Sequence, residues 1–275
     1  MSLLHVAHSS RRSPADLRAL SKGPMPIPLC AVTGAGSGFG TLARAAGDTV
    51  DLWLIRLDAD PGVVQAAASV LSDVECARAS RFHFLRHRQL FIAAHGALRR
   101  LLGTYTASHP RALTFDTEAS GRPYLVGDEP QLEFSLAHSD ELLLIAVTRR
   151  GRVGVDIERL AAVRDGDRWA CEVLSPAEAR LLNDSEGHDH RRFRSLLAVW
   201  TRKEAMLKAT GDGLAHDLRD IDSSASDFAC AVVKEIPTLA GVASVTVRSF
   251  DGPGYVGAVA LSGRHASLPL AWGSL

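Results

Sequence analysis

The chain has 275 residues, and its 31 Lys and Arg balance 31 Asp and Glu, so the formal net charge is zero. This balance argues against a protein that coats nucleic acid or an anionic membrane, because such binding needs a large positive surplus. Hydrophobic residues make up 46% and charged residues 23% of the chain. These values are typical of globular domains and exclude disorder of the whole chain. The length fits one large domain or two modest ones.

Neither a membrane span nor a secretory signal is predicted. The longest uninterrupted apolar stretch, Leu142–Val147, is far shorter than the ~20 residues that a membrane helix needs. No apolar segment follows Arg11 and Arg12, where a secretory signal would need one. The four cysteines form no C-x-x-C pair, so we expect reduced, mostly buried thiols. We therefore expect a cytoplasmic protein.

Residues 1–48 are rich in Ser, Gly, Pro and Arg, which predicts a disordered N-terminal extension. Within it, Gly34–Gly40 has the glycine spacing of a dinucleotide-binding loop. That loop needs a strand before it, but the preceding segment is interrupted by Pro24, Pro26 and Pro28. In addition, no Tyr of the chain has a Lys four positions later. An NAD(P)-dependent short-chain oxidoreductase built on Gly34–Gly40 is kept only as an alternative.

Helices and strands are predicted from residue 49 onward. Ser72 and Glu75 have capping-box spacing, which marks the start of a helix, and Gly103 is the expected end of a long one. In the first half we predict a strand at Val50–Leu57, helices at Val63–Leu71 and after Ser72, a long helix at Arg88–Leu102, and strands at Leu113–Phe115, Leu132–Leu136 and Leu142–Thr148.

The second half repeats this order loosely. Pro176 follows Ser175 at the first position of a predicted helix, where Pro is favoured. The further elements are a helix at Phe193–Thr210 and strands at Val153–Ile157, Ala229–Val233, Ser244–Phe250 and Tyr255–Leu261. We therefore expect an α+β fold of two similar lobes, residues 49–150 and 151–275, arranged as a pseudo-dimer. Each lobe would pack a small antiparallel sheet against a long helix, with the active site in the cleft between them.

Two carboxylates follow the glycine in Gly154-Val-Asp156-Ile-Glu158. On a strand, Asp156 and Glu158 share one face about 7 Å apart. Such a pair suits Mg²⁺, which takes one or two carboxylates and completes its shell with phosphate and water. Ordinary surface acids at an exposed strand end are the alternative.

Three further side chains, Trp200, Glu204 and Lys208, recur at every fourth position of a predicted helix. They therefore lie along one stripe. Trp200 indicates that the stripe faces protein, where an unpaired charge is costly, so Glu204 could be a third oxygen ligand and Lys208 a phosphate partner. A surface Glu–Lys pair is the alternative.

Arg122 and His138 complete the set of candidate residues. Arg122 stands in the rigid Gly-Arg-Pro turn of residues 121–123, and a fixed guanidinium suits a phosphate. His138 ends a predicted strand next to Ser139. A lone His is more often structural than functional, so this alternative stays open.

In this order and spacing, the motifs resemble the 4′-phosphopantetheinyl transferase superfamily in its long, two-lobed form, the type that activates surfactin synthetase. The resemblance covers about residues 50–262. It rests on G-x-D-x-E (Gly154, Asp156, Glu158), W-x-x-K-E-x-x-x-K (Trp200, Lys203, Glu204, Lys208), G-R-P (Gly121, Arg122, Pro123), F-x-x-x-H-S (Phe134, His138, Ser139) and a basic R-F entry at Arg78, Arg81 and Phe82. One departure is Ala137, because the family often has Ser there and a hydroxyl contact to coenzyme A is then missing.

The resemblance implies Mg²⁺-dependent transfer of 4′-phosphopantetheine from coenzyme A to a Ser hydroxyl of an apo acyl or peptidyl carrier protein. Adenosine 3′,5′-bisphosphate is the leaving group. By position, Asp156, Glu158 and Glu204 correspond to the Mg²⁺ ligands, and Lys208 corresponds to the residue that holds the phosphates. Glu204 is the first candidate for the base that accepts the Ser proton, and Glu158 is its rival.

Other positions carry implied roles in binding coenzyme A. Arg122 and His138 correspond to binders of the adenosine 3′-phosphate, and Arg78 to a binder of coenzyme A more generally. Lys203 is expected to make a secondary contact. These roles come from the resemblance and not from spacing.

The resemblance also implies how the chain works as a whole. Because it carries both lobes, we expect a monomer with coenzyme A in the cleft, a local hydrophobic or basic docking patch for the carrier protein, and neither nucleic acid nor membrane as a partner. A non-catalytic coenzyme A-binding protein is the other alternative. Fatty-acid, polyketide and nonribosomal-peptide synthesis are not distinguished as the pathway served.

Overall fold

The computed structural model describes most of the chain from residue 49 onward, together with one short segment before it. The described residues are 30–31, 49–57, 60–127, 131–160, 166–184, 189–211, 216–225, 230–265 and 267–273. The predicted extension is therefore outside the described residues apart from 30–31, and so is Gly34–Gly40.

A first sheet is built around two strands that are buried on both faces. β2 (Val50–Arg56) and β6 (Leu142–Thr148) pair antiparallel at its centre, and β5 (Glu133–Ser139) pairs with β6 at one edge. The other edge of β2 pairs in parallel with two short strands, β1 (Cys30–Ala31) and β11 (Leu270–Trp272). Burial on both faces explains the continuous apolar run of β6, since alternating strands have one solvated face.

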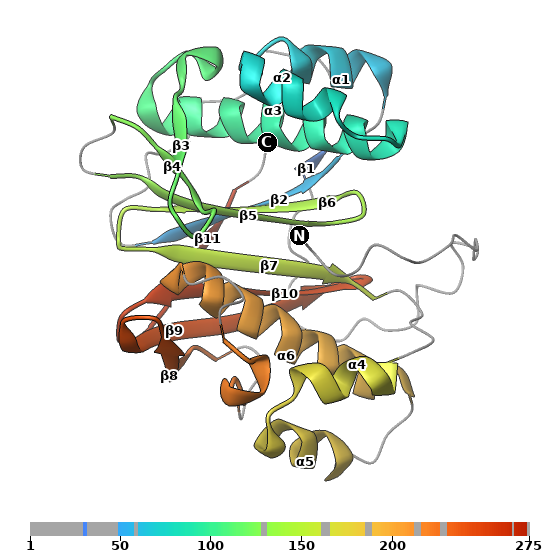
Figure 1. The fold of residues 1–275 in the computed structure, drawn as a ribbon, viewed down its shortest axis with the longest axis vertical. Coiled ribbons are helices and arrows are strands. Elements are labelled where there is room, and N and C mark those ends of the chain that lie inside the picture. The colour runs from blue at the N-terminus through green and yellow to red at the C-terminus, as the bar shows by residue number, and fades with distance from the viewer. Residues whose placement is uncertain are drawn as a thin grey trace.

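Three helices cover one face of this sheet: α1 (Pro61–Ala68), α2 (Asp73–Ser80) and α3 (Leu85–Thr106). In Figure 1 they form the outer layer next to β2 and β6. Trp53 and Ile145 point from the strands toward α3 and pack with Leu98 and Leu101. The hairpin of β3 (Phe115–Thr117) and β4 (Pro123–Leu125) lies beside this layer.

The second sheet is antiparallel throughout, in the order β7-β10-β9-β8. Its strands are β7 (Val153–Arg159), β8 (Val232–Thr238), β9 (Gly241–Gly252) and β10 (Tyr255–Ser262). The long helix α6 (Asp189–Thr210) packs on its outer face, with α4 (Gly166–Val173) and α5 (Pro176–Asp184) beside it (Figure 1).

The inner faces of the two sheets share one hydrophobic core. Leu52 and Leu144 of the first sheet pack with Val155 and Val259 of the second. The neighbouring residues of β10, such as Ala258, face α6 instead, because successive side chains of a strand point to opposite faces. The protein is therefore a mixed α+β fold whose layers are helices, sheet, sheet and helix.

Most predicted elements are present, but several boundaries differ. α3 continues past Gly103 and ends at Thr106. The residue that caps it, Ala107, has a left-handed φ of 53°. The extra turn carries Tyr105, whose hydroxyl hydrogen-bonds to Asp51 and accepts from Trp53. This tertiary contact outweighs the weak helix propensity of glycine. Strands β1, β4 and β11 and helix α4 lack predicted counterparts, and β1 lies within residues 1–48, where a disordered extension is predicted. β8 begins three residues later than expected.

Two further findings concern the whole described chain. Among the described residues, Cys76, Cys171 and Cys230 form no disulfide, but all three are exposed, so the prediction of mostly buried thiols was wrong. Each lies in or next to a short surface element, α2, α4 or the start of β8, and not in a core strand. No helix among the described residues is long and apolar enough to cross a membrane.

Candidate active site

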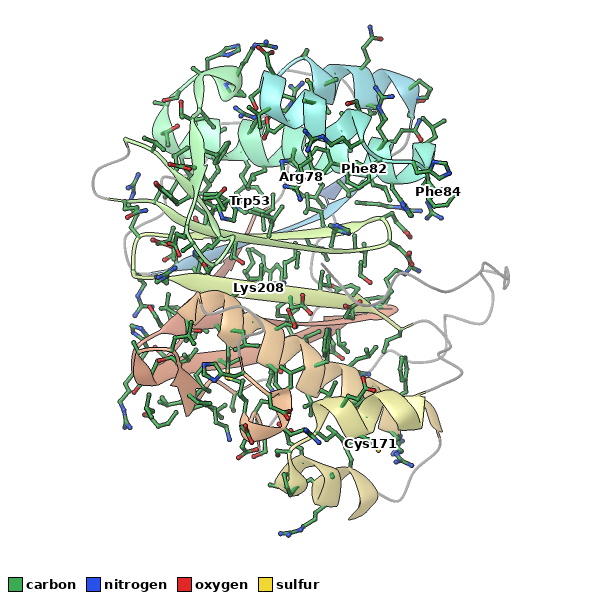
Figure 2. All side chains as sticks on the ribbon, viewed as in Figure 1. Trp53, Arg78, Phe82, Phe84, Cys171 and Lys208 are labelled. Carbon is green, nitrogen blue, oxygen red and sulfur yellow. The ribbon has the colours of Figure 1, made fainter. Side chains whose placement is uncertain are left out.

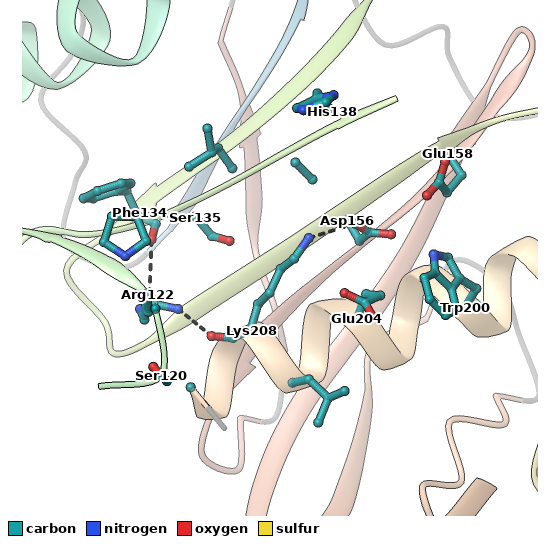
Figure 3. Close-up of a pocket in the computed structure, with 16 residues that line it drawn as sticks. Ser120, Arg122, Phe134, Ser135, His138, Asp156, Glu158, Trp200, Glu204 and Lys208 are labelled. Atoms are coloured by element: carbon teal, nitrogen blue, oxygen red, sulfur yellow. Dashed lines mark hydrogen bonds and ion pairs between the residues drawn. The ribbon is translucent and has the colours of Figure 1, made fainter. Parts of the chain in front are cut away.

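A cavity of about 500 Å³ lies where the edge of the first sheet meets β7 and α6. Its size falls in the range of small-molecule sites. Residues from four parts of the chain line it, and most candidate residues of the sequence are among them (Figure 3): Ser120–Pro123, Phe134–His138, Asp156, Glu158, Trp200, Glu204, Leu207, Lys208 and Gly211.

Asp156 and Glu158 reach the cavity because β7 alternates. Val155 and Ile157 lie in the core between the sheets, so the two carboxylates occupy the other face, next to α6. Each residue is only 7% exposed. The pairing of the two acids on one face is therefore confirmed, and the alternative of ordinary surface acids is excluded.

The helix α6 supplies the opposite wall. Trp200, Glu204 and Lys208 all line the cavity, as the four-residue spacing predicts. Lys208 does not form a surface pair: its Nζ donates to Asp156 Oδ1 at 2.8 Å and to the carbonyl oxygen of Val155 at 3.0 Å. The amino group thus connects α6 to β7 at the carboxylate pair.

Burial shapes the protonation of these groups. It raises the pKa of Asp156, although the ammonium group of Lys208 acts in the opposite direction. Burial and the neighbouring Asp156 raise the pKa of Glu158 to about 7, and burial raises the pKa of Glu204. Burial opposes the charge of Lys208, but the carboxylates of Asp156 and Glu204 outweigh it and raise the pKa of the amine. Acids with raised pKa values in a cavity are typical of functional sites.

The carboxylates also bear on metal binding. Among the described residues, no three His, Cys, Asp or Glu side chains are gathered closely enough to form a metal-binding group. However, Asp156 Oδ2 is buried and has no hydrogen-bond partner within the described part of the chain. An acceptor left without a donor in a buried site is costly, and a cation would satisfy it. Because Mg²⁺ needs only one or two protein carboxylates, the donor set fits this ion.

Arg122 lines the cavity, but its guanidinium also serves the structure around it. Its Nη1 donates to the carbonyl oxygen of Lys208, and its Nη2 donates to the carbonyl oxygen of Phe134 at 3.1 Å (Figure 3). In addition, Nη1 donates to the carbonyl oxygen of Val153 at 3.0 Å, and Nη2 donates to Glu133 at 2.8 Å. Arg122 thus joins the first sheet to β7 and α6. His138 lies at the far end of the cavity wall, exposed, on β5.

Comparison with known proteins connects this site to a family. A model of the 4′-phosphopantetheinyl transferase superfamily matches residues 152–248, which include β7 and α6. Over 171 residues the chain is 42% identical to the 4′-phosphopantetheinyl transferase HetI of Nostoc sp., and the match covers 61% of this chain and 71% of that protein. This chain belongs to the 4′-phosphopantetheinyl transferase superfamily.

Other transferases match with lower identity or coverage. The 4′-phosphopantetheinyl transferase psf-1 of Bacillus pumilus is 26% identical over 66% of this chain and 75% of its own length. The L-aminoadipate-semialdehyde dehydrogenase-phosphopantetheinyl transferase of Eremothecium gossypii is 36% identical over 47% of this chain and 49% of its own. The chain is therefore an enzyme of the phosphopantetheinyl transferase class.

Two candidate residues of the transferase lie away from the cavity. Arg78 is exposed on α2 and lies over the ring of Phe91, 5.3 Å from its centroid. Figure 2 places it with Phe82 in the helical layer of the first sheet, well separated from Lys208. Lys203 is fully buried, so it cannot make the secondary contact expected of it in the cavity.

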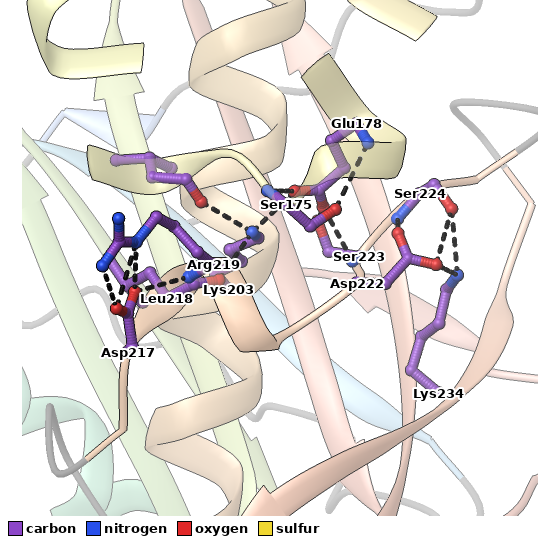
Figure 4. Close-up of polar contacts among 11 residues, drawn as sticks. Ser175, Glu178, Lys203, Asp217, Leu218, Arg219, Asp222, Ser223, Ser224 and Lys234 are labelled. Carbon is purple, nitrogen blue, oxygen red and sulfur yellow. Dashed lines mark hydrogen bonds and ion pairs between the residues drawn. The ribbon is translucent and has the colours of Figure 1, made fainter. Parts of the chain in front are cut away.

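Lys203 instead holds the C-terminal half of the transferase together. Its Nζ pairs with Glu178 at 2.6 Å and donates to the carbonyl oxygens of Val173 at 2.7 Å and Leu218 at 2.8 Å. Glu178 also accepts hydrogen bonds from Ser223 at 2.7 Å (Figure 4). The spacing of Ser175 and Glu178 matches a capping box, which forms here, so sequence could have placed Glu178 at a helix start.

The sequence did not assign roles to Ser135, Ser139 or Glu133. Glu133 is the acid that pairs with Arg122, and it appears in the sequence as one acid among many. Ser139 was visible as part of the F-x-x-x-H-S motif, but only the fold places its hydroxyl against Glu158.

Proposed function

We propose that this transferase moves 4′-phosphopantetheine from coenzyme A to a Ser hydroxyl of an apo acyl or peptidyl carrier protein. In the reaction, the Ser oxygen forms a bond to the phosphorus that carries the pantetheine. The bond from that phosphorus to the bridging oxygen of the pyrophosphate breaks, and adenosine 3′,5′-bisphosphate leaves. The observation that carries the proposal is the joint lining of one cavity by Asp156, Glu158, Glu204 and Lys208.

Glu204 is our candidate for the base. It lies on α6 opposite the two carboxylates of β7 (Figure 3), and burial raises its pKa above the ordinary value. A carboxylate with a raised pKa is a stronger base than an ordinary surface Glu. Glu158, with a pKa of about 7, is the rival for this role.

Lys208 is our candidate for the residue that holds the phosphates. Its raised pKa keeps the amine charged, and phosphoryl transfer depends on positioning and on neutralising negative charge. Two of its donors already bond Asp156 and the carbonyl oxygen of Val155, so the amine is fixed in place before substrate binds.

The predicted ligands are Asp156, Glu158 and Glu204, of which one or two would hold Mg²⁺ while phosphate and water complete its shell. When bound, this ion supplies charge neutralisation for the pyrophosphate. The buried Oδ2 of Asp156, which has no hydrogen-bond partner among the described residues, supports its part in that site. Asp156 also orients Lys208 through Oδ1, which would keep the ammonium group beside the phosphates.

Binding of the rest of coenzyme A is part of the same proposal. Arg122 and His138 line the cavity and are proposed to bind the adenosine 3′-phosphate. Arg78 is exposed on α2, one of the helices that cover the first sheet, so its charge is accessible to a ligand. It is proposed to contact a part of coenzyme A that lies outside the cavity.

We further propose that residues 49–150 and 151–275 act as two similar lobes of a monomer, preceded by the extension of residues 1–48. In support, each half contributes a sheet and a 22-residue helix, α3 or α6. One strand departs from this division, because β11 lies in the second half of the chain but pairs with β2 of the first sheet.

The direct test is labelling of apo carrier proteins by a tagged coenzyme A in the presence of Mg²⁺. Wild-type protein should label at least one member of a panel of acyl and peptidyl carrier domains. Asp156→Ala and Glu204→Ala should each lower the rate by about 100-fold or more. Chelation by EDTA should have the same effect.

Asp73→Ala is the matched control, because this acid is exposed on α2 and should leave labelling unchanged. Full activity of Asp156→Ala and Glu204→Ala would overturn the site assignment. Coenzyme A binding without labelling of any carrier would instead favour a non-catalytic binding protein.

A further inference from the structure

Within the described residues, one edge of β7 is satisfied by side chains and not by another strand. In this part of the chain, β7 is the first strand of its sheet and pairs only with β10. On the other side, its carbonyl oxygens at Val153 and Val155 accept from Arg122 and Lys208. Buried backbone groups require such partners. The backbone of the strand that carries both carboxylates is thus hydrogen-bonded by two residues of the cavity.

Two serines of β5 complete this edge. The N–H of Val155 donates to Ser135 Oγ at 3.2 Å, and the N–H of Arg159 donates to Ser139 Oγ at 3.1 Å. In each contact the serine and the N–H group are 20 residues apart in the chain. The two serines are therefore four positions apart on β5, and the two N–H groups are four positions apart on β7. We call this pair of contacts the serine clasp. It sets how β7 lies along β5, on either side of Asp156 and Glu158.

The two serines differ in one respect. Ser139 Oγ lies 2.8 Å from Glu158 Oε2 and donates to it. An ionised carboxylate can only accept, so the single proton of the Ser139 hydroxyl is directed to Glu158, while a lone pair of Oγ accepts the N–H of Arg159. Ser135 makes no such contact with a carboxylate in the described part of the chain: its hydroxyl faces the N–H of Val155. Only Ser139 therefore connects the clasp to a carboxylate of the cavity.

The turn after Ser139 fixes this hydroxyl further. β5 and β6 are joined by Asp140 and Glu141, and Asp140 has a left-handed φ of 51°. Glu141 forms an ion pair with Arg159, the same residue whose N–H meets Ser139. The hydroxyl is thus held from both sides, by the turn and by the end of β7.

We infer that Ser139 is a positioning residue of the transferase, which holds the Glu158 carboxylate in the orientation needed to bind a divalent cation. Partners of metal-binding carboxylates restrict their orientation, and their loss typically lowers metal affinity or activity by about 10- to 100-fold. This inference rests on the proposed function, in which Glu158 is a metal ligand. Ser139 itself touches neither substrate nor metal in this role.

The test compares Ser139→Ala with Ser139→Thr and Ser139→Cys. Binding of Mn²⁺ alone, as a probe for Mg²⁺, is titrated by electron paramagnetic resonance with and without coenzyme A. Ser139→Ala should weaken Mn²⁺ binding by about 10-fold and raise the half-saturating Mg²⁺ concentration for labelling, with the KM for coenzyme A changed less than about twofold. Threonine should restore most of the affinity, because it keeps the hydroxyl. Cysteine keeps the size but not a strong donor, so it should resemble alanine and remains informative where Ser139→Ala folds poorly.

Ser223→Ala is the matched control, since it removes a buried hydroxyl that donates to another buried carboxylate, Glu178, outside the cavity. It should lower the midpoint of thermal unfolding much as Ser139→Ala does, without weakening Mn²⁺ binding. Equal Mn²⁺ affinity of wild type, Ser139→Ala and Ser139→Cys, including no measurable binding by any of them, would overturn the inference. Absence of carrier labelling by wild-type protein would overturn the proposed function instead, and the Mn²⁺ titration would still decide the role of Ser139.

Discussion

A Cβ atom on Gly154 of β7 would lie 2.6 Å from the backbone nitrogen of Ala209 in α6, and closer still to the carbonyl oxygen of Ala205. The two backbones are therefore in direct contact, and only glycine permits this approach. The contact sets the distance between the carboxylates of β7 and the side chains of Glu204 and Lys208.

Gly154→Ala should push α6 away from β7. We expect a loss of about 1 to 3 kcal/mol in the free energy of unfolding, as in overpacked cores, and a fall in kcat of at least about 10-fold, because small displacements of catalytic groups are costly. Urea denaturation and carrier labelling measure the two effects. Gly62→Ala is the control, since a Cβ there meets only Asp60 Oδ1 at 3.1 Å at the start of α1. A Gly154→Ala variant with wild-type stability and rate would contradict the role of this contact.

The buried pair of Lys203 and Glu178 predicts a strongly non-additive pair of substitutions. Removing one partner leaves the other charge buried without compensation, so Lys203→Met and Glu178→Gln should each cost about 3 to 5 kcal/mol. The double variant should cost clearly less than the sum, because neither charge then remains. Chemical denaturation of all four proteins measures the coupling. Arg264→Ala, which breaks an exposed pair with Glu235, should cost less than about 1 kcal/mol. Additive losses would show that the two charges do not depend on each other.

The proposed contact between His138 and the adenosine 3′-phosphate can be tested by changing the substrate as well as the protein. His138→Ala should raise the KM for coenzyme A by about 10-fold, the size of a lost charge-assisted hydrogen bond. It should leave the KM for 3′-dephospho-coenzyme A within about twofold, because that donor lacks the phosphate. Equal losses with both donors would assign His138 to another part of the substrate.

Arg122→Ala should behave differently from His138→Ala. Like His138→Ala, it should raise the KM for coenzyme A more than the KM for 3′-dephospho-coenzyme A. Unlike His138→Ala, it should also lower the midpoint of thermal unfolding. The reason is that its guanidinium donates to the carbonyl oxygens of Val153 and Phe134 and pairs with Glu133. Calorimetry together with the two KM values separates the contributions. An unchanged unfolding midpoint would contradict the structural part of this role.

Glu75 predicts a pH dependence of stability that does not involve the cavity. Burial disfavours its charge, but hydrogen bonds from His95, Ser72 and Arg99 outweigh burial and lower its pKa to about 2. A depressed pKa contributes stability above the ordinary value of 4.5, and this contribution is lost as the pH falls toward 2. Glu75→Gln should therefore lose up to ~3 kcal/mol at pH 7.

The difference between Glu75→Gln and wild type should shrink as the pH falls below 4.5. Urea denaturation at several pH values between 7 and 3 measures it. Asp73→Asn, at an exposed acid of the same helix, serves as the control. A difference that stays constant across this range would show that the charge of Glu75 contributes nothing.

Local patterns in the sequence were sufficient to predict on which face of β7 and of α6 the candidate site residues lie. The period-2 pattern of residues 153–158 separates Asp156 and Glu158 from the core, and the four-residue spacing of Trp200, Glu204 and Lys208 aligns them on one side of α6. Both follow from the repeat of a strand or a helix, which depends only on neighbouring residues. The prediction that α3 ends at Gly103 was wrong, because the helix is extended by a hydrogen bond between Tyr105 and Asp51. These two residues are 54 positions apart in the chain, so a local pattern could not predict the contact.

What the sequence by itself determined is thus which residues share a face, and, through the motifs, the transferase family. Only the tertiary structure decided which faces meet. It brought β5, β7 and α6 around one cavity, left Arg78 outside it, buried Lys203 against Glu178, and placed Ser139 against Glu158. The physical reason is that these contacts join residues far apart in the chain, so their positions depend on the packing of both sheets and on the close approach at Gly154.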